Sequence, residues 1–299
     1  MPTTTTGPVR IWVMAARPRT LPLGVAPVLV GTALAGFLGV FHPLRFVAAV
    51  LGAVFIQIGA NLSNDYSDAH RGADTEERLG PVRVTAGGLV PPRQVLIATY
   101  ITFGIAILCG VYLIAVAGWQ ILLIGVASII AGVLYTGGPR PYGYEGLGEV
   151  FVFLFFGVAA VAGSYFAQVR HFSWESLVLS VPVGLIAAAV LVVNNVRDLD
   201  TDRRANKRTL AVRLGRERAR TMYAAMLICA YPVALLPWLL GPLRAWLLLP
   251  LATLPLAGRL IGVVSRHTDG PTLNGALAGT GQLQLGFCVL LAAGLLLSR

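Results

Sequence analysis

The sequence is poor in acidic residues: only 13 Asp and Glu occur among its 299 residues, against 23 Lys and Arg. Charged residues make up 12% of the chain, whereas soluble domains carry about 25%. Cysteine is also scarce, and the three residues lie inside apolar runs without the spacing of a metal site or a disulfide framework. These shortages exclude an ordinary soluble domain, a disulfide-stapled fold and a cysteine-bound metal.

What the sequence has in excess is apolar surface, with 56% hydrophobic residues. A membrane-spanning helix needs about 20 apolar residues. We therefore expect an all-α, multi-pass membrane protein of nine transmembrane helices, forming one domain over residues 1–299 with an interfacial or cytoplasmic segment at 1–20. The expected spans lie near 21–41, 46–63, 95–116, 118–137, 147–167, 176–196, 220–240, 243–264 and 277–297.

The positive charges predict the orientation of the chain. With the N-terminus inside and nine spans, all but four Lys and Arg fall in cytoplasmic segments, as expected for a protein of the cell membrane. The four exceptions are Arg45, Arg170, Arg244 and Arg299. The net charge of +10 is thereby explained by topology, and no nucleic-acid partner is expected.

Two short acidic clusters end apolar runs on the predicted cytoplasmic side. They are N-L-S-N-D-Y-S-D at 61–68 and N-N-V-R-D-L-D-T-D at 194–202, and they hold five of the 13 acidic residues. Carboxylates beside a membrane are costly unless they bind a cation or line a polar path. The two clusters are therefore the predicted place of the chemistry.

Helical periodicity of about 100° per residue sorts these acidic residues by face. In the second cluster Asp198 and Asp202 share a face, whereas Asp200 points almost the opposite way. In the first cluster two carboxylates and two amides lie near one face: Asn61, Asn64, Asp65 and Asp68. Asn195 joins the face of Asp198, and Asn194 adjoins it.

Four converging carboxylates with amide oxygens nearby suit a hard cation. Mg²⁺ takes oxygen ligands and is commonly held by one or two carboxylates together with substrate phosphates. Two such half-sites that face each other would bind a magnesium diphosphate between them. The alternative interpretation, helix capping and solvated loop residues, suits one cluster better than two matching ones.

Basic and aromatic residues accompany the clusters. Arg83 and Lys207 lie in loops that return toward the membrane, and guanidinium and ammonium groups bind phosphate oxygens. Tyr135, Tyr142 and Tyr144, in a Gly- and Pro-rich turn, can offer ring faces to a cation. The alternatives are positive-inside residues and interfacial aromatic residues; likewise Arg17 either binds substrate or anchors the entry helix.

With these motifs the chain resembles the UbiA superfamily of intramembrane prenyltransferases, and within it the 1,4-dihydroxy-2-naphthoate polyprenyltransferases of menaquinone biosynthesis. The resemblance covers nearly the whole chain. It rests on N-D-Y-S-D-A-H-R-G-A-D-T with E-R-L-G-P-V-R-V-T, A-R-P-R-T-L-P at 16–22, Y-T-G-G-P-R-P at 135–141, L-G-E at 147–149, K-R-T-L-A-V-R-L-G at 207–215 and the C-terminal G-T-G-Q-L-Q-L-G.

The resemblance implies a helix bundle around a central lipid-open cavity with a cytoplasmic cap over a diphosphate. Position by position, the residues matching the magnesium and diphosphate ligands are Asn64, Asp65, Asp68, Asp198 and Asp202, and Arg17 matches an arginine near the acceptor or the diphosphate. The family's first motif often has a further Asp where this chain has Gly72. Asp74 is the nearest acidic residue and is a candidate metal ligand.

The implied reaction transfers a polyprenyl group from a polyprenyl diphosphate to 1,4-dihydroxy-2-naphthoate, with loss of carbon dioxide and diphosphate, and yields demethylmenaquinone. Another aromatic acceptor, 4-hydroxybenzoate or homogentisate, is the alternative within this class. An ion-coupled secondary transporter is the alternative from a different class. It would place carboxylates in the middle of spans, whereas the acidic clusters lie at span ends.

Overall fold

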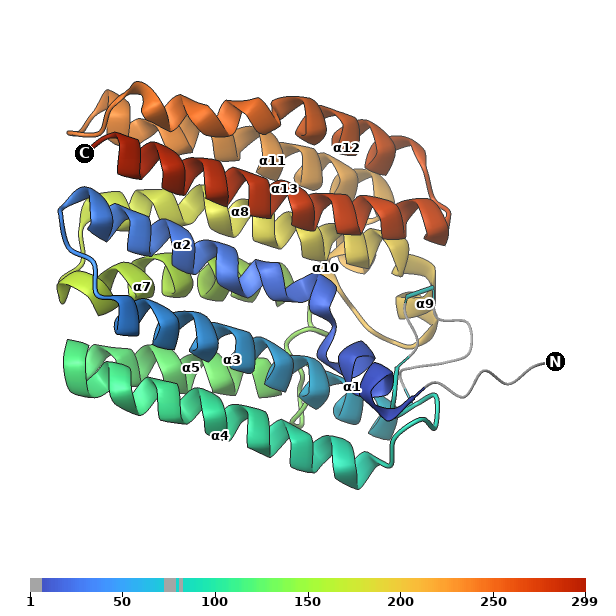
Figure 1. Ribbon diagram of the computed structural model, residues 1–299. Coiled ribbons are helices and arrows are strands. Elements are labelled where there is room, and N and C mark those ends of the chain that lie inside the picture. Colours follow the sequence, from blue (N-terminus) through green and yellow to red (C-terminus); the bar gives the residue numbers. More distant parts are fainter. Residues whose placement is uncertain (1–6, 73–78, 81–82) are drawn as a thin grey trace.

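The computed structural model describes residues 7–72, 79–80 and 83–299, and within these ranges every regular element is a helix. The long helices lie side by side in one bundle (Figure 1), which confirms the all-α fold predicted from the sequence. In chain order the elements are α1 (Pro8–Ala16), η1 (Pro18–Thr20), α2 (Leu21–Phe37), α3 (Pro43–His70), α4 (Pro92–Ala117), α5 (Gln120–Leu134), α6 (Gly148–Val152), η2 (Phe153–Ala159), α7 (Ala160–Val169), α8 (Trp174–Arg197), α9 (Leu199–Arg204), α10 (Leu210–Leu214), α11 (Arg216–Leu239), η3 (Ala245–Thr253), α12 (Leu254–Arg266) and α13 (Gly270–Leu297).

Eight helical segments in the described part of the chain are long and apolar enough to cross a membrane. The expected span at 118–137 forms α5, which has 15 residues, fewer than the about 20 that a full crossing needs. The total of nine crossings therefore stays a prediction. The protein is a multi-pass membrane protein in either case.

The span that begins at Gly148 is not a uniform α-helix. Its middle seven residues form the π-helix η2, between α6 and α7. Here η2 crosses α8 at two glycines, and a Cβ atom at Gly157 would lie 2.6 Å from the Cα of Gly184. Small residues let helix backbones approach closely in membranes, so this crossing holds η2 directly against α8.

Helix α8 is the central element of the bundle. It packs against α11, α13, η2 and α7, and most of its residues are buried. Its C-terminal end, with which the second acidic cluster begins, is buried at Asn195 and Arg197, and Asp198 directly after it is also buried, whereas Asp200 further on in the cluster is exposed.

Both acidic clusters lie at the same end of the bundle. Helix α3 runs through the first cluster to His70, and α8 ends at Arg197, with Asp198 linking it to α9. Helices α1, α9 and α10 gather at this end, whereas the C-terminus lies at the other (Figure 1). The polar residues of both predicted clusters are thereby concentrated at one end of the bundle.

The close crossing of η2 and α8 generates a stability prediction. Gly157→Ala places a methyl group against the backbone of Gly184 and Ser180, and such overpacking costs about 1–3 kcal/mol. We expect a lower melting temperature in detergent, measured by circular dichroism.

The matched control is Gly104→Ala in α4, where a Cβ meets nothing within 4 Å. This change replaces Gly by a better helix former and leaves the melting temperature equal or higher. Equal melting temperatures of Gly157→Ala and the unchanged protein would contradict the tight crossing.

Candidate active site

The first acidic cluster provides two buried carboxylates on the last turns of α3 with different partners. The Oδ1 and Oδ2 atoms of Asp65 accept hydrogen bonds from the backbone N–H groups of Thr85 and Val84, at 3.0 and 3.1 Å. Asp65 thereby holds the loop that follows α3. It is 2% exposed, and its predicted role as a metal ligand stays a prediction.

Asp68, three residues later, lies against the central cavity. Its Oδ1 atom accepts a hydrogen bond from the Tyr144 hydroxyl at 2.6 Å, and its Oδ2 atom pairs with the Arg83 guanidinium at 3.3 Å. The pair is largely buried, which strengthens a charge-assisted contact relative to water. Arg83, predicted from its place in a returning loop, thus lies beside the first cluster.

The second cluster places two of its three carboxylates on the same cavity. Asp198 and Asp202 line it, and Asp202 accepts a long hydrogen bond of 3.5 Å from the Thr209 hydroxyl. Asp200 is exposed and pairs with Arg216 at 2.8 Å. The prediction that Asp200 points away from its neighbours is confirmed.

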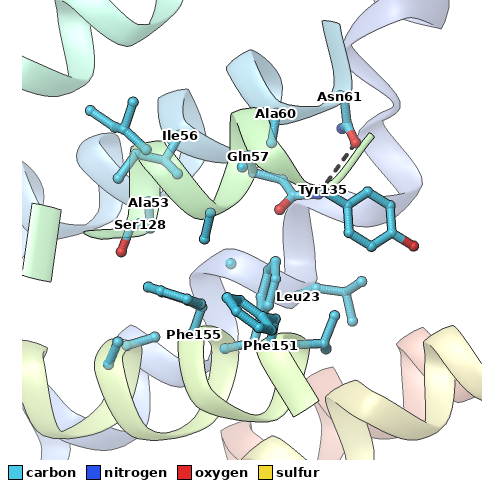
Figure 2. Close-up of a pocket in the computed structure, with 18 of the residues that line it drawn as sticks. Leu23, Ala53, Ile56, Gln57, Ala60, Asn61, Ser128, Tyr135, Phe151 and Phe155 are labelled. Carbon is cyan, nitrogen blue, oxygen red and sulfur yellow. Dashed lines mark hydrogen bonds between the residues drawn. The ribbon is translucent and has the colours of Figure 1, made fainter. Parts of the chain in front are cut away.

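The cavity has a volume of about 740 Å³ and is apolar along most of its length. Figure 2 shows Phe151 and Phe155 on one side, facing Ala53 and Ile56 of α3 on the other. Twelve of the predicted site residues line it: Arg17, Asn61, Asn64, Asp68, Arg83, Tyr135, Tyr142, Asn194, Asn195, Asp198, Asp202 and Lys207. The cavity thus joins a charged end to an apolar interior.

The asparagines of the site have defined partners. The side-chain NH₂ group of Asn61 donates to the backbone oxygen of Ala16 and to the Thr20 hydroxyl, both at 3.0 Å. The backbone carbonyl of Asn61 accepts a hydrogen bond from the Arg17 guanidinium at 3.3 Å. Asn61 therefore holds the turn that carries Arg17, which has a left-handed backbone at φ 54°. Asn64 accepts a hydrogen bond from Thr136 at 3.0 Å.

Asn195 donates to the buried carboxylate of Glu149 at 2.8 Å. An amide whose nitrogen faces a carboxylate turns its oxygen the other way. The Asn195 side chain thereby keeps its oxygen for the cavity that it lines.

Tyr144 was predicted from the sequence only as a ring that could face a cation, and the structure adds the bond from its hydroxyl to Asp68. Besides its bond to Asp68, its ring lies 4.7 Å from the Lys207 ammonium, and its carbonyl accepts from the Arg208 N–H at 2.9 Å. Tyr144 thus connects α3 to the loop after α9. Its place in the turn with Tyr135 and Tyr142 was the only signal for it.

Aromatic rings form one continuous wall of the cavity. Tyr135 meets Tyr142 edge to face at 5.5 Å, Tyr142 stacks on Phe151 at 3.9 Å, and Phe155 follows at 6.1 Å. Burial raises the pKa of Tyr142 above its usual range, so its ring stays a neutral phenol. Neutral rings can stabilise a nearby cation through their faces.

The charged end of the cavity carries hard oxygen donors, and no three His, Cys, Asp or Glu of the described residues lie close enough together to hold a metal ion by themselves. Carboxylates of Asp68, Asp198 and Asp202 and the amide of Asn195 approach from α3 on one side and from α8 and α9 on the other. Such a divided set of hard oxygen donors suits a cation that shares its coordination with phosphate oxygens. Asp74, the further candidate ligand, lies outside the described residues.

A deep apolar cavity with a carboxylate-rich, arginine-lined end defines an intramembrane site for an amphiphilic anion. Comparison with known proteins gives the class more closely. The UbiA prenyltransferase family matches residues 24–274. Among curated proteins, the 1,4-dihydroxy-2-naphthoate octaprenyltransferase of Mycobacterium tuberculosis is 40% identical to this chain. The match covers 95% of this chain and 96% of that protein.

The 1,4-dihydroxy-2-naphthoate octaprenyltransferase of Escherichia coli is 37% identical, with 96% of each chain covered. Among solved structures, a UbiA homolog from Archaeoglobus fulgidus bound to DMAPP and Mg²⁺ superposes with a TM-score of 0.70, at 15% identity, over 95% of this chain and 98% of that one. The chain belongs to the UbiA prenyltransferase family, and it is an enzyme of prenyl transfer.

The contact between Tyr144 and Asp68 generates a prediction. Tyr144→Phe keeps the ring beside Lys207 but removes the hydroxyl that donates to Asp68. A hydrogen bond to a charged group contributes about 1.5–3 kcal/mol, which corresponds to a fall of about 10- to 100-fold in the rate of prenyl transfer. The measurement is kcat/KM for the prenyl diphosphate.

Tyr100→Phe, on an exposed position of α4, is the matched control and keeps the full rate. A Tyr144→Phe enzyme as fast as this control would show that the hydroxyl does not contribute to the reaction.

Proposed function

We propose that this protein transfers a polyprenyl group from a polyprenyl diphosphate to 1,4-dihydroxy-2-naphthoate, with release of carbon dioxide and diphosphate. The observation that carries the proposal is the cavity, where carboxylates, amides and basic groups at one end continue into an aromatic and aliphatic interior. That shape matches a substrate with a charged head and a long apolar tail. The naphthoate acceptor is the one named for the relatives described above.

The cofactor of the proposed reaction is Mg²⁺. Asp68, Asp198 and Asp202 would hold it, with Asn64 and Asn195 as further oxygen donors and Asp65 and Asp74 as the remaining candidates from the sequence. When bound, the cation neutralises charge on the diphosphate leaving group. The solved homolog of the same fold that is bound to DMAPP and Mg²⁺ supports this assignment.

The protein's own residues have separate tasks in the reaction. Arg83, Lys207 and Arg17 would bind diphosphate oxygens through charge-assisted hydrogen bonds as the C–O bond breaks. The apolar walls exclude water from the allylic cation, and Tyr135 and Tyr142 face it with neutral rings. The tail extends along the aromatic wall toward the lipid.

The acceptor ring supplies the electrons for the new bond. Its carboxylate-bearing carbon attacks the allylic carbon, the C–C bond forms, and loss of carbon dioxide restores aromaticity. The product is the reduced form of demethylmenaquinone. Because the carboxylate leaves as carbon dioxide, no strong general base is needed at the ring carbon, in agreement with the absence of His among the residues lining the described cavity.

The proposed location is the cell membrane, with the charged end of the cavity on the cytoplasmic side. The positive-inside pattern of Lys and Arg supports this orientation. A transporter with acidic residues at mid-membrane is disfavoured, because Asp68, Asp198 and Asp202 lie at the ends of α3 and α8 and in α9. The UbiA-type alternatives with 4-hydroxybenzoate or homogentisate differ only in the acceptor.

An assay with purified protein tests the reaction and its acceptor. With Mg²⁺, a polyprenyl diphosphate and 1,4-dihydroxy-2-naphthoate, we expect carbon dioxide and diphosphate to be released in equal amounts. Removal of divalent metal by a chelator should stop both. Prenylation of 4-hydroxybenzoate in preference to the naphthoate would overturn the acceptor and leave the family assignment intact.

The carboxylates are tested separately. Asp68→Asn and Asp198→Asn each remove a charge from the cation site, and metal stabilisation of a leaving group is worth several kcal/mol. We expect kcat to fall by about 100-fold or more. Asp200→Asn, on the exposed face of α9, is the control and keeps its activity; full activity of either site variant would refute the metal assignment.

A further inference from the structure

Arg197 is a buried arginine within the second acidic cluster, and it does not itself line the cavity. Its side chain is only 2% exposed. The residues around the cavity include its neighbours Asn194 and Asp198 but not Arg197. A guanidinium with no access to the cavity cannot bind the diphosphate, so its charge has another use.

The guanidinium holds two cavity-lining side chains at once. Its Nε and Nη2 atoms donate to Oδ1 and Oδ2 of Asp198 at 2.7 and 2.5 Å. The Nη2 atom also donates to Oδ1 of Asn194 at 2.9 Å. The bidentate contact between Arg197 and Asp198 fixes the plane of the Asp198 carboxylate, which a single hydrogen bond would not do.

These contacts determine which atoms face the cavity. Each oxygen of Asp198 has one lone pair toward Arg197 and another that remains for a ligand on the cavity side. The Asn194 oxygen is taken up by Arg197, so its NH₂ group remains as a donor. Asp198 thereby offers oxygens to a cation, and Asn194 offers a hydrogen-bond donor to a phosphate oxygen.

Arg197 is itself anchored by the last helix. Its Nη1 atom donates to Oδ1 of Asn274 in α13 at 2.6 Å, and the Asn274 NH₂ group donates to Leu79 O at 2.9 Å. Asn274 therefore presents its oxygen to the guanidinium because its nitrogen is used elsewhere. The chain Leu79, Asn274, Arg197, Asp198 connects three distant parts of the sequence.

We propose that Arg197, anchored by Asn274, is a positioning residue that orients Asp198 and Asn194 for the cation and the diphosphate. This inference rests on the proposed function. Side chains that orient metal ligands from behind typically change metal affinity by about 10- to 100-fold when they are replaced. Arg197 and Asn274 act through Asp198, without touching the substrate.

Two variants test the contact of Arg197 with Asp198 and the contact of Arg197 with Asn274. Arg197→Lys keeps the positive charge, but an ammonium cannot hold both Asp198 oxygens in one plane together with Asn194 and Asn274. Asn274→Ala removes only the anchor. We expect Mn²⁺ binding in the presence of inorganic diphosphate, measured by electron paramagnetic resonance, to weaken about 10-fold or more in both. The Mg²⁺ concentration for half-maximal activity should rise in parallel.

Asn274→Asp distinguishes the contact of Asn274 with Arg197 from its contact with Leu79. It keeps an acceptor for Arg197 and loses the donor to Leu79, so we expect Mn²⁺ affinity close to that of the unchanged protein. Asp200→Asn is the matched control in the same segment, and its Mn²⁺ affinity stays within about twofold. Circular dichroism and gel filtration report whether each variant is folded, and Asn274→Ala tests the proposal if Arg197→Lys does not fold.

Each outcome decides between the hypotheses. Unchanged Mn²⁺ affinity in folded Arg197→Lys or Asn274→Ala, with or without a lower melting temperature, would overturn the positioning role. Loss of Mn²⁺ affinity in Asn274→Asp equal to that in Asn274→Ala would also overturn the positioning role. The loss would then come from the missing hydrogen bond to Leu79 O and not from the contact with Arg197. If the unchanged protein binds no Mn²⁺ with diphosphate, the proposed metal site fails first, and this inference fails with it.

Discussion

The structure depends on keeping several carboxylates charged at the end of an apolar cavity. A buried charge is costly unless it is paired and hydrogen-bonded. The two sides of the cavity meet this requirement in the same way: Asp68 pairs with Arg83, and Asp198 pairs with Arg197. Each pair leaves its carboxylate on the cavity wall, so that neutralisation does not remove it from the site.

This requirement explains the polar network at the charged end of the bundle. The backbone of the loop after α3 is held by Asp65, the turn after α5 is joined to Asp68 by Tyr144, and α13 reaches the second cluster through Asn274. Loops and helix ends that are distant in sequence thus stabilise one another around the site. The crossing of η2 and α8, in contrast, depends on close packing of backbones, which Gly157 and Gly184 allow.

Much of the site was predictable because acidic residues are so rare in this chain. Asp68, Asp198 and Asp202 stood out against an apolar background, and helical periodicity correctly separated Asp200 from them. Periodicity predicted Asp65 near the face of Asp68, but the Asp65 oxygens accept hydrogen bonds from the backbone N–H groups of Val84 and Thr85. Helical periodicity predicts the direction in which a side chain points, but it does not predict which neighbouring group will form hydrogen bonds with it.

Arg197 and Phe151 were not distinguishable from topology-setting arginines and membrane phenylalanines, and the sequence suggested the ring of Tyr144 but not the bond from its hydroxyl to Asp68. Their roles arise from contacts across large sequence separations, such as that between Arg197 and Asn274. The π-helix η2 and the short α5 were equally hidden, because hydrophobicity records apolar length and not the local geometry of the backbone.

By itself, the sequence determined that the chain is a helical membrane protein with two acidic clusters at helix ends, because few charges and long apolar runs leave no other stable fold in lipid. Only the tertiary structure decided which carboxylates line the cavity, which arginines pair with them and which side chains hold the asparagine amides of the site. Those outcomes depend on which side chains come within hydrogen-bonding distance once α3, α8 and α13 are packed together.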